Sequence, residues 1–253
     1  MRKKRAPRHA RADAGLWLYG LHAVRAALAN TRRRVVRAVV TQHTADELGR
    51  GVLGRVRWEI ADADAIGRLL PHGAVHQGAA LACEPLPPFE ITEVLAQDNA
   101  NRRFIVVLDQ LSDPQNVGAI LRSAAAFGAT AVVVQDRHAP PESGALAKAA
   151  SGALDIVPYV SVVNIARALE QLGAAGFWRI ALAGDGEQTL DDARVDGDMA
   201  LVLGSEGAGL RRLVRERCDV AAYIPMKSAM ESLNVSNAAA IALYELRQDR
   251  GVT

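Results

Sequence analysis

Short runs of mostly apolar residues alternate with stretches of helical spacing along the C-terminal part of this 253-residue chain. Six such runs occur, at residues 104–108, 131–134, 156–160, 178–183, 199–203 and 221–224. A strand with one solvated face alternates apolar and polar side chains, whereas most of these runs are apolar throughout. They therefore predict an α/β domain built on a mainly parallel sheet that helices cover on both faces.

A smaller α/β unit precedes this domain. Its apolar pattern indicates a helix over 16–29, strands over 35–40 and 56–60, and helices over 45–53 and 62–70. Prolines and a polar run then mark an interdomain connection. We therefore expect a disordered basic tail at 1–13, an N-terminal domain at 14–84, a linker at 85–101 and a C-terminal domain at 102–253.

The net charge of +2 conceals an uneven distribution of charge. Residues 1–37 hold eleven Lys and Arg side chains and one Asp, giving +10. The other 216 residues hold 19 basic and 27 acidic side chains, giving −8. A basic segment on an acidic body indicates a polyanionic partner, although a solvated tail without any partner would carry the same charge.

Cysteine spacing and hydropathy exclude several classes of protein. Cys83 and Cys218 lie far apart and have no neighbouring Cys or His pair at zinc-binding spacing, so we expect no metal site. Charged and polar residues interrupt the apolar stretch at 16–29, which argues against a secretion signal. No stretch approaches the ~20 apolar residues that a membrane span requires. These patterns favour a cytoplasmic protein without a membrane partner.

The first segment with chemical character, residues 108–128, leaves a strand and enters a helix. Asp113 followed by proline has the form of an N-cap with proline at the first helical position. Asn116 lies in the first turns of this helix, and Arg122 follows it among small apolar residues. The forked donors of Arg122 suit a phosphate or a carboxylate, but a solvated or structurally paired arginine would show the same pattern.

The second segment, Leu201-Val-Leu-Gly-Ser-Glu-Gly-Ala-Gly-Leu210, is a strand that enters a glycine-rich turn. Closely spaced glycines let a backbone approach a ligand and offer amide donors to it. Their spacing matches neither the dinucleotide fingerprint nor the P-loop. Many turns between a strand and a helix contain glycine, so this segment alone is a weak signal.

The third segment, residues 224–245, ends a strand at Pro225 and is expected to begin a helix near Ser232. Four polar side chains crowd the first turns of that helix: Ser232, Asn234, Ser236 and Asn237. Simple capping uses one or two of these groups, so the excess indicates a buried polar site. Ordinary capping together with surface asparagines is the alternative.

In this order, the three segments closely resemble the three motifs of the SpoU (TrmH-like) branch of the SPOUT RNA methyltransferases. The matching stretches are Asp-Pro-Gln-Asn-Val-Gly-Ala-Ile-Leu-Arg at 113–122, Gly-Ser-Glu-Gly-Ala-Gly at 204–209, Ile-Pro-Met at 224–226 and Ser-Leu-Asn-Val-Ser at 232–236. Residues 19–28 and 75–78 resemble the N-terminal substrate domain of the bacterial 23S ribosomal RNA guanosine ribose methyltransferases.

The resemblance implies that a homodimer transfers methyl from S-adenosylmethionine to a ribose 2′-hydroxyl of RNA, most simply a guanosine of 23S ribosomal RNA. It also implies a deep trefoil knot in the C-terminal SPOUT domain and an L30e-like N-terminal domain. By position, the cofactor contacts are Gly204, Gly207, Gly209, Ile224, Met226 and Leu233. The catalytic group is Asn116, Arg122, Glu206, Ser232 and Asn234.

The motifs leave the role of Arg122 open between a base and a phosphate clamp. A guanidinium has a pKa above about 12 and is a poor base, so we prefer the clamp, with the bound phosphate relaying the proton. Asn116 and Ser232 would then orient the ribose or Arg122, and Glu206 would hold the polar network. Asn237 departs from the motif, because the family more often has an apolar residue there.

Three other functions fit parts of the sequence. The first is the same reaction on transfer RNA, although transfer RNA enzymes of the family commonly lack the N-terminal unit. The second is a non-catalytic RNA-binding protein on the same fold, which the complete catalytic set opposes. A nucleotide-dependent oxidoreductase would fit the glycine turn alone, but the chain has no suitably placed fingerprint.

Deleting residues 1–13 should weaken RNA binding and leave cofactor binding unchanged. This segment carries six Lys and Arg side chains and one Asp, and their attraction to phosphates does not depend on nucleotide sequence. The dissociation constant for a 23S ribosomal RNA fragment, measured at several salt concentrations, should depend less on salt after the deletion. Identical salt dependence of the shortened and full chains would contradict the prediction.

Overall fold

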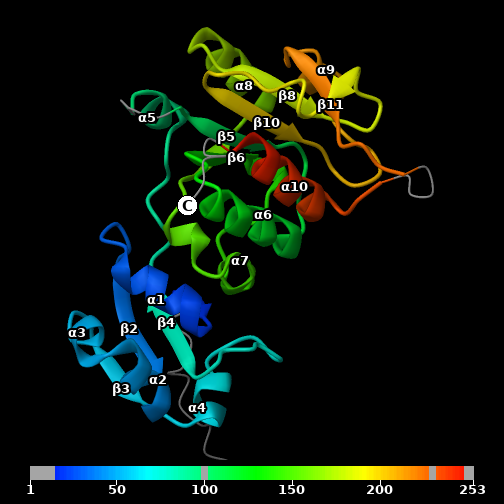
Figure 1. The fold of residues 1–253 in the computed structure, drawn as a ribbon. Coiled ribbons are helices and arrows are strands. Elements are labelled where there is room, and N and C mark those ends of the chain that lie inside the picture. The colour runs from blue at the N-terminus through cyan, green and yellow to red at the C-terminus, as the bar shows by residue number, and fades with distance from the viewer. Residues whose placement is uncertain (1–14, 98–101, 228–231, 248–253) are drawn as a thin grey trace, which may run out of the picture.

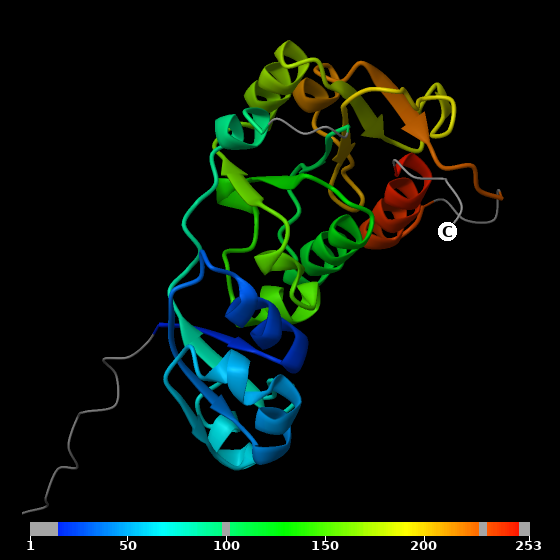
Figure 2. The same ribbon diagram turned by 60° about the vertical axis from the view of Figure 1, so that its left-hand side comes forward.

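A computed structural model describes residues 15–97, 102–227 and 232–247 of the chain, and the structural statements below concern these residues. They form two sheets, one in each half of the molecule (Figure 1, Figure 2). The tail that we expect to be disordered, at 1–13, lies outside the described residues.

The N-terminal sheet has four strands in the order β1-β4-β2-β3. Strand β4 pairs antiparallel with β1 and β2, whereas β3 pairs parallel with β2. The strands are β1 (Leu16–Tyr19), β2 (Val35–Val40), β3 (Trp58–Ile60) and β4 (Ala79–Cys83), and the helices are α1 (Leu21–Ala29), α2 (Gln42–Leu48), α3 (Arg50–Leu53) and α4 (Ala63–Gly67). The small α/β unit expected from the sequence is therefore present.

The sequence prediction was wrong at three places in this unit. Residues 16–19 form a strand instead of the first turns of a helix, because Gly20 adopts a φ of 93° and separates that strand from α1. The helix expected over 45–53 is divided in two by Gly49, whose φ is 83°. Strand β4 escaped prediction because alanine, which supplies three of its five residues, has a low strand propensity.

The C-terminal sheet has seven strands in the order β7-β6-β5-β10-β8-β11-β9, and each neighbouring pair is parallel. The strands are β5 (Phe104–Leu108), β6 (Ala131–Gln135), β7 (Tyr159–Val162), β8 (Trp178–Leu182), β9 (Gln188–Thr189), β10 (Met199–Leu203) and β11 (Val220–Tyr223). All six apolar runs contribute strand residues, so the predicted parallel α/β domain is confirmed.

Helices cover both faces of the C-terminal sheet. One face packs against α6 (Pro114–Ala126), α7 (Gly144–Ala150) and α10 (Val235–Leu246), and the other packs against α5 (Ile91–Leu95), α8 (Ile165–Ala174) and α9 (Arg212–Arg215). Within β5, Val106 and Leu108 belong to the first core, whereas Ile105 and Val107 belong to the second. Successive side chains of a strand point to opposite faces, so both faces need apolar residues. Helix α5 falls inside the segment expected to be a linker.

The two halves meet where α7 packs against β1 and where the 3-10 helix η2 (Ala153–Asp155) packs against α1. Figure 2 shows this junction between the two sheets. A Cβ at Gly144 would come within 2.4 Å of the Tyr19 ring, and a Cβ at Gly152 would come within 2.8 Å of the Ala26 methyl group. Glycine at these positions permits the close contact. The N-terminal stretch 19–28, which carries part of the family resemblance, thus forms the junction.

A buried ion pair lies at the centre of the junction. Arg33 Nε donates to Asp155 Oδ1 at 2.9 Å, and Arg33 Nη1 donates to Glu142. The Arg33 side chain is fully buried. Burial lowers the pKa of Arg33, but hydrogen bonds to Asp155 and Glu142 outweigh burial and the pKa is raised overall. The carboxylates are also fixed by Asn30, which donates to Asp155, and by the backbone N–H of Leu86, which donates to Glu142.

Replacing Arg33→Ala should destabilise the protein by roughly 3–5 kcal/mol, because it leaves two carboxylates without their buried partner. The free energy of unfolding from urea denaturation measures this effect. The matched control is Arg34→Ala, which removes an adjacent arginine whose ion pair with Glu84 is exposed and should cost about 0–1 kcal/mol. Equal losses in the two variants would contradict the prediction.

Candidate active site

The three chemically distinctive segments meet at the edge of the sheet where β10 and β11 end. The second and third segments line a cavity of about 850 Å³, a size that suits a small-molecule or cofactor site. All six residues expected to contact a cofactor line this cavity: Gly204, Gly207, Gly209, Ile224, Met226 and Leu233. Three of the five expected catalytic residues line it as well: Glu206, Ser232 and Asn234. The structure thus gathers residues far apart in the sequence around one space.

The glycine turn owes its shape to close backbone contact. A Cβ at Gly204 would lie 2.2 Å from the carbonyl carbon of Gly209, so no other residue fits there without moving the backbone. Gly207 and Gly209 adopt φ values of 81° and 66°, which favour glycine. The backbone N–H of Gly209 donates to the Ser205 carbonyl at 2.9 Å and closes the turn. The result is a compact loop that presents Glu206 beside the cavity.

A network of side chains joins the three segments at the cavity. Asn234 Nδ2 donates to Glu206 Oε1 at 2.7 Å and to Asn116 Oδ1 at 3.0 Å. Asn116 Nδ2 donates to the same Glu206 oxygen at 3.4 Å, and the backbone N–H of Val235 donates to it at 3.2 Å. Glu206 therefore accepts hydrogen bonds from both other segments. One carboxylate oxygen fixes the relative positions of three distant stretches of chain.

The helix of the third segment begins later than the sequence predicted. Helix α10 starts at Val235 instead of near Ser232, because Asn234 is its N-cap. Asn234 Oδ1 accepts from the backbone N–H groups of Ser236 and Asn237 at 2.9 and 3.4 Å. Ser232 precedes the helix and is exposed at the cavity. Asn234 therefore caps the helix and lines the cavity, whereas Ser232 lines the cavity without capping the helix.

Asn116 and Arg122 have different surroundings, although both lie on α6. The Asp113 side chain caps α6 by accepting from the backbone N–H of Asn116 at 3.3 Å, and this places the Asn116 side chain in the network. Arg122 lies further along α6 and is exposed. It makes no hydrogen bond or ion pair within the described part of the chain. The structure thus brings Asn116 to the site but leaves Arg122 outside the network.

One wall of the cavity was missed by the sequence analysis. It consists of Leu182, the last residue of β8, the three residues that follow it, 183–185, and Arg215. Arg215 Nη1 donates to Asp185 Oδ2 at 2.7 Å, and this hydrogen bond lowers the pKa of the exposed Asp185 carboxyl. A Cβ at Gly186 would lie 2.7 Å from the backbone of Ala222. The sequence Gly184-Asp-Gly186 directly after a strand was the signal that could have revealed this wall.

A second missed feature anchors the end of the glycine turn. Asp109 is fully buried at the end of β5 and accepts from Arg211 Nε at 2.9 Å and from the Arg211 backbone N–H at 3.0 Å. Arg211 Nη2 also donates to Gln135 at 2.9 Å. These bonds tie the chain just beyond the turn to β5 and β6. No local pattern around Asp109 predicts them.

The cysteines do not have the properties of reactive thiols. Burial raises the pKa of both Cys83 and Cys218 to about 12, so both remain protonated at neutral pH. Over the described ranges, we find no group of three or more His, Cys, Asp or Glu side chains that could hold a metal ion. No helix in those ranges has the length and apolarity to cross a membrane.

A parallel α/β sheet with a cavity outside the carboxyl ends of its strands defines a ligand-binding domain of the open-sheet class. The chain belongs to the SpoU rRNA Methylase family, whose model matches residues 103–244. A second model, described as "RNA 2'-O ribose methyltransferase substrate binding", matches residues 17–89. The two models correspond to the two sheets.

Relatives extend this similarity over nearly the whole chain. The 23S rRNA (guanosine-2'-O-)-methyltransferase RlmB of Coxiella burnetii is 35% identical and aligns with 92% of this chain and 95% of its own. The SpoU methyltransferase AviRb of Streptomyces viridochromogenes, solved in complex with AdoMet, superposes with a TM-score of 0.76 at 25% identity over 95% of this chain and 92% of that chain. A TrmH/SpoU tRNA modifying enzyme of A. aeolicus has a TM-score of 0.52 at 26% identity over 62% of this chain and 78% of its own.

Replacing Gly204→Ala should distort the glycine turn, because the new methyl group would meet the Gly209 backbone. We expect the variant to lose about 1–3 kcal/mol of unfolding free energy, as overpacking does. Amide hydrogen exchange over residues 203–210 should also accelerate. Gly197→Ala is the control, because a Cβ there meets no atom within 4 Å and φ is not positive. Unchanged stability and exchange in Gly204→Ala would show that the turn is not packed as described.

Proposed function

We propose that this chain transfers a methyl group from S-adenosylmethionine to the 2′-hydroxyl of a guanosine in 23S ribosomal RNA. The observation that carries the proposal is the hydrogen-bonded network of Asn116, Glu206 and Asn234 beside a glycine-lined cavity. That network assembles the three segments on which the family resemblance rests. The match of both halves to methyltransferase family models supports the same function.

The cavity fits the methyl donor in size and in chemistry. Its aliphatic walls include Leu182, Leu203 and Leu233, which suit the faces of an adenine ring. Gly204, Gly207 and Gly209 let the backbone approach the ligand closely, and Ile224, Met226 and Leu233 complete the group that would hold it. When bound, the cofactor supplies an electrophilic methyl group on a sulfonium. The protein therefore needs no nucleophile of its own.

Positioning is the main task left to the chain's own residues, because methyl transfer requires the attacking oxygen in line with the bond that breaks. Asn116 and Ser232 orient the ribose, and Asn234 and Glu206 hold Asn116 in place. Arg122 binds the phosphate next to that ribose. Because it is exposed and has no partner among the described residues, its guanidinium is available for bidentate contact. The phosphate, not the guanidinium, relays the proton of the hydroxyl.

The N-terminal unit favours ribosomal RNA over transfer RNA as the substrate. The relatives named for 23S ribosomal RNA align with 92% of this chain. The transfer RNA modifying enzyme of A. aeolicus aligns with 62% of this chain. A substrate-binding unit that packs against α7 and η2 gives the enzyme a second contact with a large RNA.

The finer architecture is also part of the proposal. The domains span 14–84 and 102–253, the C-terminal domain contains a deep trefoil knot, and the N-terminal domain is L30e-like. The enzyme works as a cytoplasmic homodimer. Support for the dimer comes from α10, where Ile241 and Tyr244 are 44% and 53% exposed although the opposite side of the helix is buried. A second copy covering this face would remove that apolar surface from water.

Replacing Arg122→Ala should lower kcat/KM for ribose methylation by about 100-fold, because the ribose loses its neighbouring clamp. Arg122→Lys should also lose most activity, since lysine cannot make the bidentate contact. Cofactor affinity measured by calorimetry should stay unchanged, and Arg167→Ala, an exposed arginine on α8, should retain activity.

The same variants test the substrate in cells. In a strain lacking the protein, mapping of ribose methylation should show the loss of one 2′-O-methylguanosine from the large-subunit RNA. The wild-type chain should restore that mark and Arg122→Ala should not. Loss of a mark from transfer RNA alone would overturn the substrate proposal, and full restoration by Arg122→Ala would overturn the role of the arginine.

A further inference from the structure

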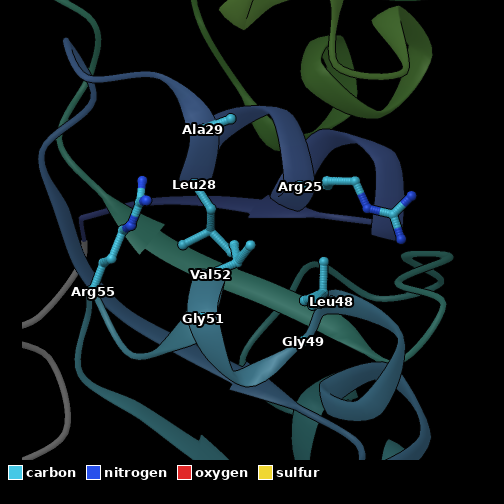
Figure 3. A pocket seen from close by; sticks show the side chains of 8 residues that line it. All are labelled: Arg25, Leu28, Ala29, Leu48, Gly49, Gly51, Val52 and Arg55. Atoms are coloured by element: carbon cyan, nitrogen blue, oxygen red, sulfur yellow. The ribbon is translucent and has the colours of Figure 1, made fainter.

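A second cavity lies in the N-terminal unit, between α1 and the turn that joins α2 to α3 (Figure 3). Its volume is about 400 Å³, and we call it the α1–α3 pocket. Aliphatic side chains and glycines form its walls. Leu28 and Ala29 lie on α1, and the facing wall consists of Leu48 at the end of α2, Gly49, and Gly51 and Val52 on α3. These residues are separate from the site at the C-terminal sheet and have no part in the methyl transfer described above.

Gly51 lines the α1–α3 pocket, although the backbone does not require glycine there. Its φ is not positive, and a Cβ at this position would meet no atom within 4 Å. Alanine has a higher helix propensity than glycine, and Gly51 is the second residue of the short helix α3. The chain thus has glycine in the pocket wall at a position where the backbone would accept a side chain. Glycine at position 51 leaves this part of the α1–α3 pocket free for a ligand.

Two arginines stand at opposite ends of the α1–α3 pocket (Figure 3). Arg25 Nη2 donates to Glu47 Oε1 at 3.2 Å, in an ion pair whose side chains are both more than two-fifths exposed. Such pairs exchange readily for other partners because they contribute little stability. Arg55 is exposed and makes no ion pair or hydrogen bond in the described part of the chain. Arg55 therefore makes one end of the pocket positively charged, and Arg25 at the other end can contact an anion in exchange for Glu47.

We propose that the α1–α3 pocket receives one unstacked nucleobase of the RNA substrate while Arg25 and Arg55 contact the phosphates on either side. Single-stranded RNA is recognised by splaying its bases onto apolar or aromatic surfaces while basic side chains follow its backbone. A nucleotide has a flat base with apolar faces and a phosphate on each side, which matches aliphatic walls with an arginine at each end. The inference rests on the proposed function for its RNA, and it adds a base-binding site to the unit that matches the substrate-binding model.

The test compares binding of the full chain to two labelled probes of equal charge. One is an oligoadenylate of roughly 12 nucleotides, and the other is an abasic ribose-phosphate of the same length. The wild-type protein should bind the oligoadenylate about 10-fold more tightly than the abasic probe. Gly51→Phe, which fills the pocket, should abolish this preference without changing affinity for the abasic probe. Gly51→Ala, which adds only a methyl group, should keep most of it.

A second pair of variants tests the charges. Arg55→Gln should weaken binding to both probes and reduce the slope of log affinity against log salt by about one. Arg57→Gln is the matched control, because Arg57 is exposed, has no ion pair among the described residues and does not line the pocket. It should change affinity by less than about 2-fold. Equal effects of the two substitutions would overturn the assignment of Arg55.

Ala29→Phe fills the α1–α3 pocket from the opposite wall and keeps the test decisive if Gly51→Phe does not fold. Equal affinity of the wild-type protein for both probes, or base preference that survives both filling substitutions, would overturn the inference. A change in sedimentation caused by either filling variant would also overturn it, because the pocket would then hold a second copy of the chain.

Methylation of a 23S ribosomal RNA transcript is measured in parallel. Base preference without methylation would overturn the proposed function and leave the pocket standing.

Discussion

The parallel direction of all neighbouring strands in the C-terminal sheet is the constraint on which the rest of this structure depends. Parallel strands end at the same edge, so the loops after β8, β10 and β11 open on one side and enclose one cavity. Parallel pairing also requires crossover helices, which cover both faces and demand apolar residues on each. The same constraint thus explains the uninterrupted apolar runs and the place of the site.

The junction between the two halves solves a different physical problem. A substrate-binding unit is useful to a distant reaction centre only if its position is fixed, and apolar contacts alone have little directional preference. Arg33 adds direction, because its fork must meet Asp155 and Glu142 on the other half of the molecule. Removing these charges from water costs free energy, so the pair contributes orientation more than stability. The junction therefore orients the unit that contains the α1–α3 pocket relative to the half that contains the cavity.

Buried strands could be predicted because burial on both faces requires a run of apolar residues. Contacts between residues far apart in the sequence could not be predicted, because no local pattern identifies the partners. The runs at 104–108 and 199–203 predicted strands since both of their faces are buried. Arg32, Arg33 and Arg34 look alike in sequence, yet only Arg33 is buried, and its two carboxylate partners lie more than a hundred residues away. The members of the site could be predicted as a group from the resemblance. The bonds among Asn116, Glu206 and Asn234, and the separation of Arg122 from them, required the folded chain.

The amide of Asn234 shows why asparagine, and not another capping residue, stands at the start of α10. Its oxygen accepts from the first backbone N–H groups of the helix, while its nitrogen donates to Glu206 and Asn116. Aspartate caps helices as well as asparagine does, but it has no donor, and its charge would face the Glu206 carboxylate at hydrogen-bonding distance. Serine could cap the helix, but it is too short to serve both sides. The need for an acceptor toward the helix and a donor toward the carboxylate selects the amide, so forming the helix and assembling the site are one structural event.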